Sequence, residues 1–249
     1  TGWSAVLIIS KPRTRRSFSL SSVIPSEGSD MAKVSLFLMV IGIFVFYLYL
    51  FLLLFFNLKQ KEKNSLLNSF GYQFYSSQPF SLRIVLYLLL FASSLLIGVS
   101  EALYFSSMRS YFFLVLSFLF PLSLLFLTAG NVIPLSKYKL HILFSMMGFV
   151  FFSLSCLLFA FSTLVPGAVL YQGSINVVCQ IALGLIGGLF FLLLFNPKLT
   201  DWAKMEKSEV DGTTYYLKPK VNYLALYEWG ALFFETFAAA ILFANGIQY

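Results

Sequence analysis

Six long apolar stretches alternate with short polar ones along the chain, and this pattern predicts its architecture. A helix needs about 20 predominantly apolar residues to cross the hydrocarbon layer of a bilayer. Six segments have this character, and each is bounded by charged residues, Pro, Gly or Asn: 34–57, 83–104, 111–129, 140–164, 174–196 and 221–244. The sequence therefore predicts an all-α, polytopic membrane protein, a bundle of six transmembrane helices.

The first thirty residues differ from the rest of the chain. They contain a basic run at 11–16 and a Ser-rich stretch, whereas Met31 leads almost directly into the first apolar segment. We expect residues 1–30 to be a disordered or non-native tail, and residues 31–249 to form the six-helix domain. The apolar run after Met31 is longer than the 7–15 residues of a signal-peptide core, so we expect it to remain as a helix.

Two of the polar connections have a character of their own. Residues 59–82 mix lysines with aromatic side chains, which is typical of a segment lying on the membrane surface. The connection 197–220 carries Asp211-Gly212 between two short strand-like runs. Because Asp-Gly supplies the positive φ angles of a type I′ turn, a small cytoplasmic hairpin is expected over residues 204–218.

Composition agrees with a membrane protein and excludes some partners. The chain is 59% hydrophobic and only 11% charged, whereas a soluble domain carries about 25% charged residues. The net charge of +7 comes from short basic runs between the apolar stretches. No basic face with interleaved aromatic residues is present, so we expect no nucleic-acid partner.

The distribution of basic residues predicts the orientation. The connections after the first, third and fifth segments hold most of the 17 Lys and Arg residues. By the positive-inside rule, loops 58–82, 130–139 and 197–220 are then cytoplasmic and both termini lie outside. We expect the plasma membrane of a prokaryote.

Acidic residues are rare within the apolar segments: only Glu101, Glu228 and Glu235 occur there. A charged side chain at the bilayer centre costs at least ~2.5–3.5 kcal/mol, so each needs a partner, a wet cavity or a proton. Glu228 and Glu235 are seven residues apart and share a helix face with small alanines. Two interpretations stay open: a track for protons or cations, or hydrogen-bonded glutamates that fix helix packing.

The remaining polar candidates lie nearer the ends of the predicted helices. His141, the only histidine, begins the fourth helix at a depth that Glu228 could approach. A His–Glu contact, a side chain extending to the interface, or an acid–base or binding role would each suit it. Glu101 lies near the outer end of the second helix, where a salt bridge to Arg109 or an interfacial carboxylate is expected.

The fifth predicted helix carries groups suited to packing. Gln180 and Asn176 lie one turn apart and are expected to hydrogen-bond within the bundle. Gly184 and Gly188 have the GxxxG spacing that lets two helices approach closely. The two cysteines lie in apolar stretches without metal-ligand spacing, so we expect buried thiols and no metal.

Catalytic motifs are missing from the sequence. There is no Walker A loop, no HExxH and no GxSxG, so we expect neither an enzyme nor a cofactor. The leading hypothesis is a non-catalytic bundle that binds membrane lipids, a protein partner or a second copy. The alternatives are a proton- or cation-coupled transporter or channel using Glu235, Glu228 and His141, and, third, a membrane enzyme.

Two short stretches resemble a known family. His141 is followed by Gly148 and an aromatic-rich run, and the last predicted helix contains Tyr227-Glu228-Trp229. These resemble the helix-start histidine and the Glu-Trp pair of the six-helix family that includes the damage-regulated autophagy modulators and related bacterial and archaeal membrane proteins. The resemblance implies a six-helix protein linked to lipid or membrane processes, in which His141, Glu228 and Trp229 are the positions that matter.

Overall fold

The computed structural model describes residues 26–59, 69–108, 110–164, 174–196, 207–210, 213–216 and 221–246. Over these residues the chain forms seven α-helices, two short 3-10 turns and one pair of strands. The helices are α1 (Ser26–Leu58), α2 (Gly71–Ser76), α3 (Phe80–Ser107), α4 (Tyr111–Val132), α5 (Tyr138–Ala160), α6 (Ser174–Leu193) and α7 (Tyr223–Gly246). A long helix occupies each of the six apolar segments, and α2 is an additional short one.

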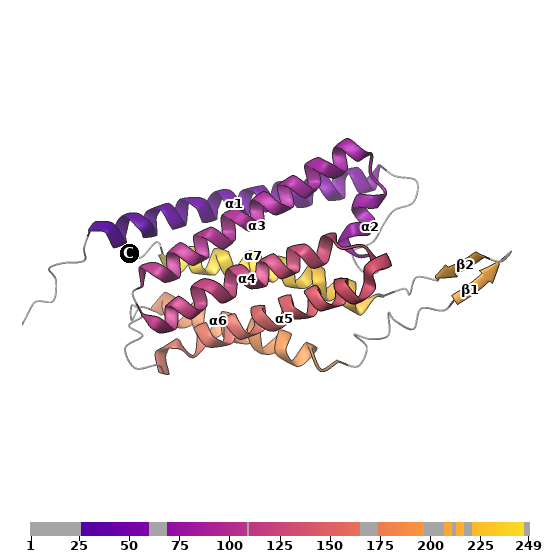
Figure 1. Cartoon of the computed structure of the whole chain (residues 1–249). Coiled ribbons are helices and arrows are strands. Elements are labelled where there is room, and N and C mark those ends of the chain that lie inside the picture. Colours follow the sequence, from indigo (N-terminus) through magenta and orange to yellow (C-terminus); the bar gives the residue numbers. More distant parts are fainter. Residues whose placement is uncertain are drawn as a thin grey trace, which may run out of the picture.

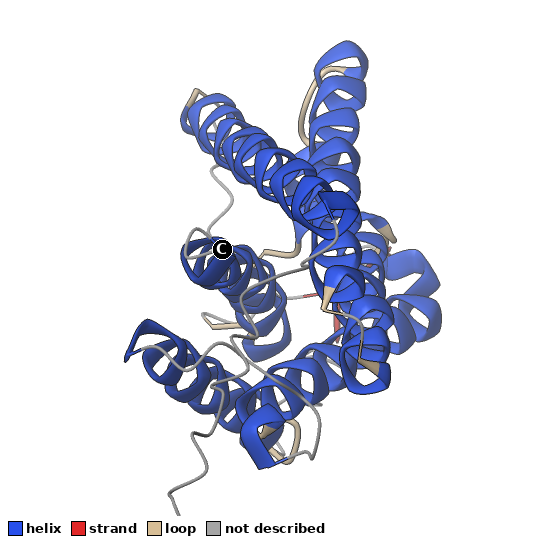
Figure 2. Ribbon diagram, turned by 90° about the vertical axis from the view of Figure 1, so that its left-hand side faces the viewer, coloured by secondary structure: helices blue, strands red, loops and turns tan. Residues whose placement is uncertain are grey.

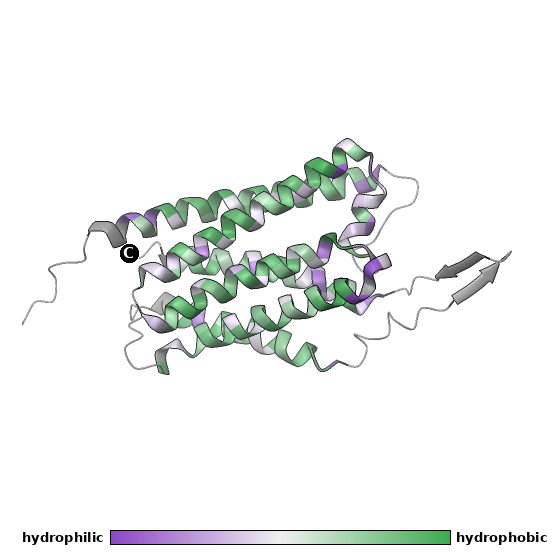
Figure 3. Ribbon diagram, in the orientation of Figure 1, coloured by the Kyte–Doolittle hydropathy of each residue, from purple (hydrophilic) through white to green (hydrophobic). Residues whose placement is uncertain are grey.

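The long helices identify an integral helical membrane protein. Five of them have the length and hydropathy to cross a bilayer: Asp30–Leu58, Phe80–Ser107, Tyr111–Val132, Lys139–Ala160 and Tyr223–Ala244. The apolar part of α6, Val177–Leu193, is shorter. Large apolar side chains such as Phe44, Leu88 and Phe118 are exposed along the helices, and green covers the flanks of the bundle in Figure 3. So much outward-facing apolar surface suits lipid rather than water.

The last helix, α7, lies among the others. In Figure 1, α1 runs alongside α3, and α4, α5 and α6 follow in order. Helix α7 contacts α1, α3, α4, α5 and α6. Seen from the end, helices lie above, to the right of and below the one that ends at the C-terminal mark (Figure 2). Three alanines of its inner face, Ala231, Ala238 and Ala239, are fully buried, because small side chains let neighbouring helices approach closely.

Several helix ends differ from the prediction. Helix α1 begins at Ser26, so residues 26–30, expected to belong to the tail, are helical; residues 1–25 lie outside the described part of the chain. Helix α5 stops at Ala160, and the 3-10 turn Ser162–Leu164 completes the predicted span. Helix α4 continues through Pro121, whose missing N–H removes only one bond of the helical ladder.

The two strands pair where the sequence predicts a hairpin. Strand β1 (Lys207–Val210) runs antiparallel to β2 (Thr213–Tyr216). Val210 lies opposite Thr213, which leaves a two-residue connection. That connection, Asp211-Gly212, lies outside the described residues, as does the connection 165–173.

The segment before α3 differs most from expectation. Instead of lying on the membrane surface, Phe70, Phe74 and Tyr75 are fully buried among the helix ends; residues 60–68 lie outside the described part. Burial raises the pKa of the Tyr75 hydroxyl well above its ordinary value, and this hydroxyl is hydrogen-bonded to that of Tyr49 on α1. These aromatic side chains therefore cover helix ends inside the protein instead of contacting lipid headgroups.

Gly71 permits this burial. A Cβ atom at position 71 would lie 1.8 Å from Oδ1 of Asn131 on α4. The backbone carbonyl oxygen of Asn131 would lie 3.0 Å from the same Cβ, so any side chain there would displace the Asn131 side chain and crowd the backbone of α4. Gln73 helps to start the short helix, because its Oε1 accepts a hydrogen bond from the backbone N–H of Phe70 at 3.0 Å.

Candidate functional site

Polar side chains gather at two places along α7. The first, here named the histidine cluster, consists of His141, Ser145 and Glu228. The second, the carboxyl cluster, consists of Glu101, Ser123 and Glu235. The two glutamates of α7 lie on one face about 10 Å apart along the helix axis, given the rise of 1.5 Å per residue.

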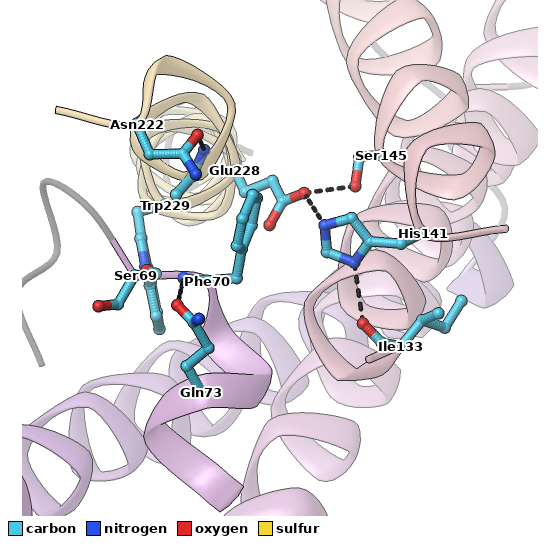
Figure 4. A network of polar contacts seen from close by, with 10 residues as sticks. Ser69, Phe70, Gln73, Ile133, His141, Ser145, Asn222, Glu228 and Trp229 are labelled. Atoms are coloured by element: carbon cyan, nitrogen blue, oxygen red, sulfur yellow. Dashed lines mark hydrogen bonds and ion pairs between the residues drawn. The ribbon is translucent and has the colours of Figure 1, made fainter. Parts of the chain in front are cut away.

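The histidine cluster joins α5 to α7. Glu228 Oε1 accepts a hydrogen bond from Ser145 Oγ at 2.6 Å and lies 2.9 Å from His141 Nε2 (Figure 4). Both side chains are buried, with 0% of the histidine and 2% of the glutamate exposed. Of the alternatives that the sequence left open for His141, the His–Glu contact is therefore the one present.

The hydrogen bonds of His141 determine the protonation of the pair. His141 Nδ1 lies 2.9 Å from the carbonyl oxygen of Ile133, which can only accept, so Nδ1 carries a proton. The opposite ring nitrogen faces a carboxyl oxygen of Glu228. One proton then lies between them, and it is assigned to the more basic imidazole, so that the pair is an imidazolium and a carboxylate with no net charge. Glu228 thus has its compensating group inside the protein.

Segment 69–76 packs against the histidine cluster and the residue that follows Glu228. The Phe70 ring meets the His141 ring edge-on, with centroids 4.9 Å apart. Trp229 Nε1 donates a hydrogen bond to the carbonyl oxygen of Ser69 at 3.0 Å, and its ring packs on Phe74. Figure 4 shows Ser69, Phe70, His141 and Trp229 together near the start of α7. Trp229, singled out from the sequence, therefore fastens the buried segment to α7.

The start of α7 places Glu228 and Trp229. Asn222 precedes the helix, and its Oδ1 accepts a hydrogen bond from the backbone N–H of Ala225 at 3.3 Å. Asparagine is favoured at this position because its side chain satisfies an otherwise unpaired N–H of the first turn. The cap fixes where α7 begins, and hence the depth of Glu228 and Trp229, which follow it by about two turns.

The carboxyl cluster lies deeper in the bundle. Glu235 Oε1 accepts a hydrogen bond from Ser123 Oγ of α4 at 2.6 Å. Glu101 of α3 lies within electrostatic range of Glu235, and the Cys156 thiol of α5 lies within range of both. Glu101 and Glu235 are each 0% exposed. Three helices therefore contribute carboxyl or hydroxyl groups to one buried polar site, and a fourth, α5, carries a thiol within electrostatic range.

This arrangement corrects the prediction for Glu101. The side chain is fully buried rather than interfacial, and the side chain of Arg109 lies outside the described residues. Neither oxygen of Glu101 has a hydrogen-bond partner among the described residues, and neither does Oε2 of Glu235. Unlike Glu228, these two carboxyls have no basic side chain paired with them in the described part of the chain.

The remaining predicted residues serve helix packing. Gln180 Nε2 donates to Ser162 Oγ at 3.1 Å, which ties α6 to the turn after α5; the side chain of Asn176 lies outside the described residues. Gln180 therefore belongs to neither cluster.

The glycine prediction is half wrong. A Cβ at Gly184 would lie 3.0 Å from the Cβ of Ala160, whereas a Cβ at Gly188 would meet nothing within 4 Å. The second close approach uses Gly187, where an added Cβ would lie 2.8 Å from the Cβ of Cys156. Residues three and four apart both follow a helix face, so spacing alone did not distinguish Gly187 from Gly188.

Neither cluster has the geometry of a familiar catalytic or metal site. Among the described residues, no group of three or more His, Cys, Asp or Glu side chains is placed to hold a metal ion. Ser145 donates to Glu228 rather than to His141. The trio therefore lacks the hydroxyl–imidazole contact that activates a serine nucleophile.

Sequence reasoning missed three parts of this site: Ser145, Ser123 and the segment around Ser69 and Phe70. Serines in an apolar helix carry no signal of their own, because most of them bond to the preceding turn of the same helix. Comparison with known proteins adds no residue roles. No family model matches the chain, and no curated protein or solved structure matches it either.

Proposed function

We propose that the chain is a six-span, non-catalytic membrane protein that binds anionic lipid at its lysine-rich end. The observation that carries this proposal is a contrast in exposure. The two carboxyl groups of α7 are buried, whereas Lys59, Lys137 and Lys139 are exposed at the end of the bundle where α7 begins. A basic rim above an apolar flank suits a negatively charged headgroup with its acyl chains.

The proposal counts α6 as the sixth span. Its 20 residues pack against α5 and α7, both of which are long enough to cross the bilayer. With six crossings, the lysine-rich end faces the cytoplasm and both termini lie outside. Single cysteines introduced at Lys137 and at Ser110 test this orientation. An impermeant maleimide applied to intact cells is expected to label position 110 and not position 137.

Lipid retention tests the binding function. The protein is reconstituted into nanodiscs containing equal amounts of phosphatidylglycerol and phosphatidylcholine. It is then extracted with detergent and purified, and the lipid that remains bound to it is quantified. Phosphatidylglycerol is expected to be enriched, and replacement of Lys59, Lys137 and Lys139 by Gln is expected to remove most of the enrichment. Lys33→Gln is the matched control, because Lys33 lies at the other end and pairs with Asp30 at 3.5 Å. Equal retention of both lipids by the unaltered protein would contradict the proposal.

Proton-coupled transport is the second candidate, and the carboxyl cluster is the observation that favours it. Carboxyl groups inside a membrane commonly relay protons in pumps and transporters. Proteoliposomes with an internal pH dye separate the two functions. Transport predicts proton flux that Glu235→Gln abolishes, whereas a binding protein gives no flux in either form.

A further inference from the structure

We propose that Glu101 and Glu235 form a buried proton-binding site in which both carboxyl groups are protonated at neutral pH. The site goes beyond lipid binding and does not depend on it. Three helices converge there: α3 supplies Glu101, α7 supplies Glu235, and α4 supplies the Ser123 hydroxyl that donates to Glu235 Oε1 at 2.6 Å. Both carboxyl side chains are 0% exposed.

Unpartnered oxygen atoms point to bound protons. Three of the four carboxyl oxygens of the pair have no hydrogen-bond partner among the described residues. An ionised carboxylate in a dry interior needs several donors or a cation, since the unsolvated charge is otherwise very costly. A protonated carboxyl needs far less compensation. Because Glu235 Oε1 accepts the hydrogen bond from Ser123, Oε2 is the oxygen that can carry the proton.

The groups that face the pair offer no positive charge. Helix α4 contributes the neutral Ser123 hydroxyl, and α5 contributes the Cys156 thiol, which is within range of both carboxyls. Cys179 of α6 and Tyr49 of α1 have partners elsewhere. No Lys, Arg or His among the described residues forms an ion pair with Glu101 or Glu235. Two ionised carboxyls would therefore leave two negative charges together inside the bundle.

The donor set suits protons better than a metal ion. A hard cation such as Ca²⁺ takes six to eight oxygen ligands. The cluster offers the carboxyl oxygens, one hydroxyl and the Cys156 thiol, and sulfur is a poor ligand for hard cations. Among the described residues no group of three or more His, Cys, Asp or Glu side chains is placed to hold a metal ion, so the two glutamates and Cys156 do not form one.

Removal of these protons has a structural consequence. Two like charges that are close together repel strongly at low dielectric. Deprotonation therefore requires water to enter, which separates α7 from α3 and α4. The folded bundle holds protons that the unfolded chain would release at neutral pH, so the site makes the stability of the bundle fall as the pH rises.

Infrared spectroscopy of the purified full-length protein tests the proposal directly. The C=O stretching band of protonated carboxyl groups, identified by its shift in D₂O, is expected at pH 7. Glu101→Gln and Glu235→Gln are each expected to remove about half of the intensity due to the pair, and the double variant all of it. Glu228→Gln is the matched control, because Glu228 has His141 as its partner; it should retain the full intensity due to Glu101 and Glu235. A wild-type spectrum without the band, or a band unchanged in the double variant, would overturn the proposal.

Thermal unfolding of the wild-type protein gives a second readout that needs no variant to fold. The unfolding temperature is expected to fall as the pH is raised above neutrality, and to be unchanged when Na⁺ is replaced by choline at constant ionic strength. A higher unfolding temperature in Na⁺, accompanied by loss of the infrared band, would show a metal cation in place of the protons and overturn the proposal.

Discussion

The histidine cluster and the carboxyl cluster lie two turns apart on one face of the same helix, yet their charges are balanced differently. Glu228 lies 2.9 Å from His141 Nε2, so a single proton shared by two side chains makes the first cluster neutral. The carboxyl cluster combines two acids and no basic group among the described residues. Burial alone therefore does not determine how an ionisable residue behaves in this bundle; the neighbour on the facing helix does.

The difference follows from which helix meets α7 at each depth. Near its beginning, α7 faces the start of α5, where His141 and Ser145 lie on one side of that helix, four residues apart. Farther along, α7 faces α4 and the second half of α3, which present Ser123 and Glu101. The first cluster joins α5 to α7 at one end of the bundle, and the second brings α3 and α4 to the same face of α7.

The largest effect is expected from removing the base of the histidine cluster. His141→Ala leaves the Glu228 carboxylate buried without its partner, and breaking a buried pair in this way costs about 3–5 kcal/mol. Equilibrium unfolding in mixed detergent micelles measures the loss. The double variant His141→Phe, Glu228→Leu is the control, because it removes both charges together and should recover much of the stability. If the single variant is as stable as the wild type, the pair does not hold α5 to α7.

The two serines should distinguish a charged acceptor from a neutral one. Ser145 donates to Glu228, which shares its proton with His141, whereas Ser123 donates to Glu235, which we infer to be protonated. A hydrogen bond to a charged group contributes about 1.5–3 kcal/mol, and one between neutral groups about 0.5–1.5 kcal/mol.

Ser145→Ala should therefore destabilise the protein more than Ser123→Ala, although both bonds are 2.6 Å long. Each alanine variant is compared with the wild type by equilibrium unfolding at pH 7, and again at higher pH. The gap should close at higher pH as Glu235 loses its proton. Equal losses at neutral pH would argue that the two glutamates carry the same charge.

The long helices could be predicted from the sequence because the bilayer imposes a length and a composition on every span. The sequence also admitted the His141–Glu228 contact as one of several alternatives, since the depth of a residue follows from its distance to the end of an apolar run. Depth alone, however, did not bring Glu101 to Glu235. That meeting depends on the side chains with which α3 packs against α4 and α7, and the hydropathy pattern says nothing about such pairwise packing.

The buried segment at 69–76 shows the same limit. Its aromatic residues are equally compatible with a headgroup layer and with the end of a helix bundle. What decides between them is a close approach of Gly71 to Asn131, where an added Cβ would lie 1.8 Å from Oδ1. A single glycine in a polar loop does not reveal this contact, because glycines are common in turns of many kinds.

The smallest effect concerns the link between that segment and the histidine cluster. Trp229→Phe keeps most of the ring contact with Phe74 but removes the hydrogen bond to the Ser69 carbonyl, 3.0 Å in length. The expected loss of stability is about 0.5–1.5 kcal/mol. Hydrogen exchange should locate it, with faster exchange in residues 69–78 and little change around Glu235. Tyr227→Phe is a control at the neighbouring position, since it removes a hydrogen bond of a different kind: the Tyr227 hydroxyl accepts from Asn196 Nδ2 at 2.8 Å. If exchange also quickens around Glu235, the two clusters open together, and the segment at the end of the bundle controls water access to both.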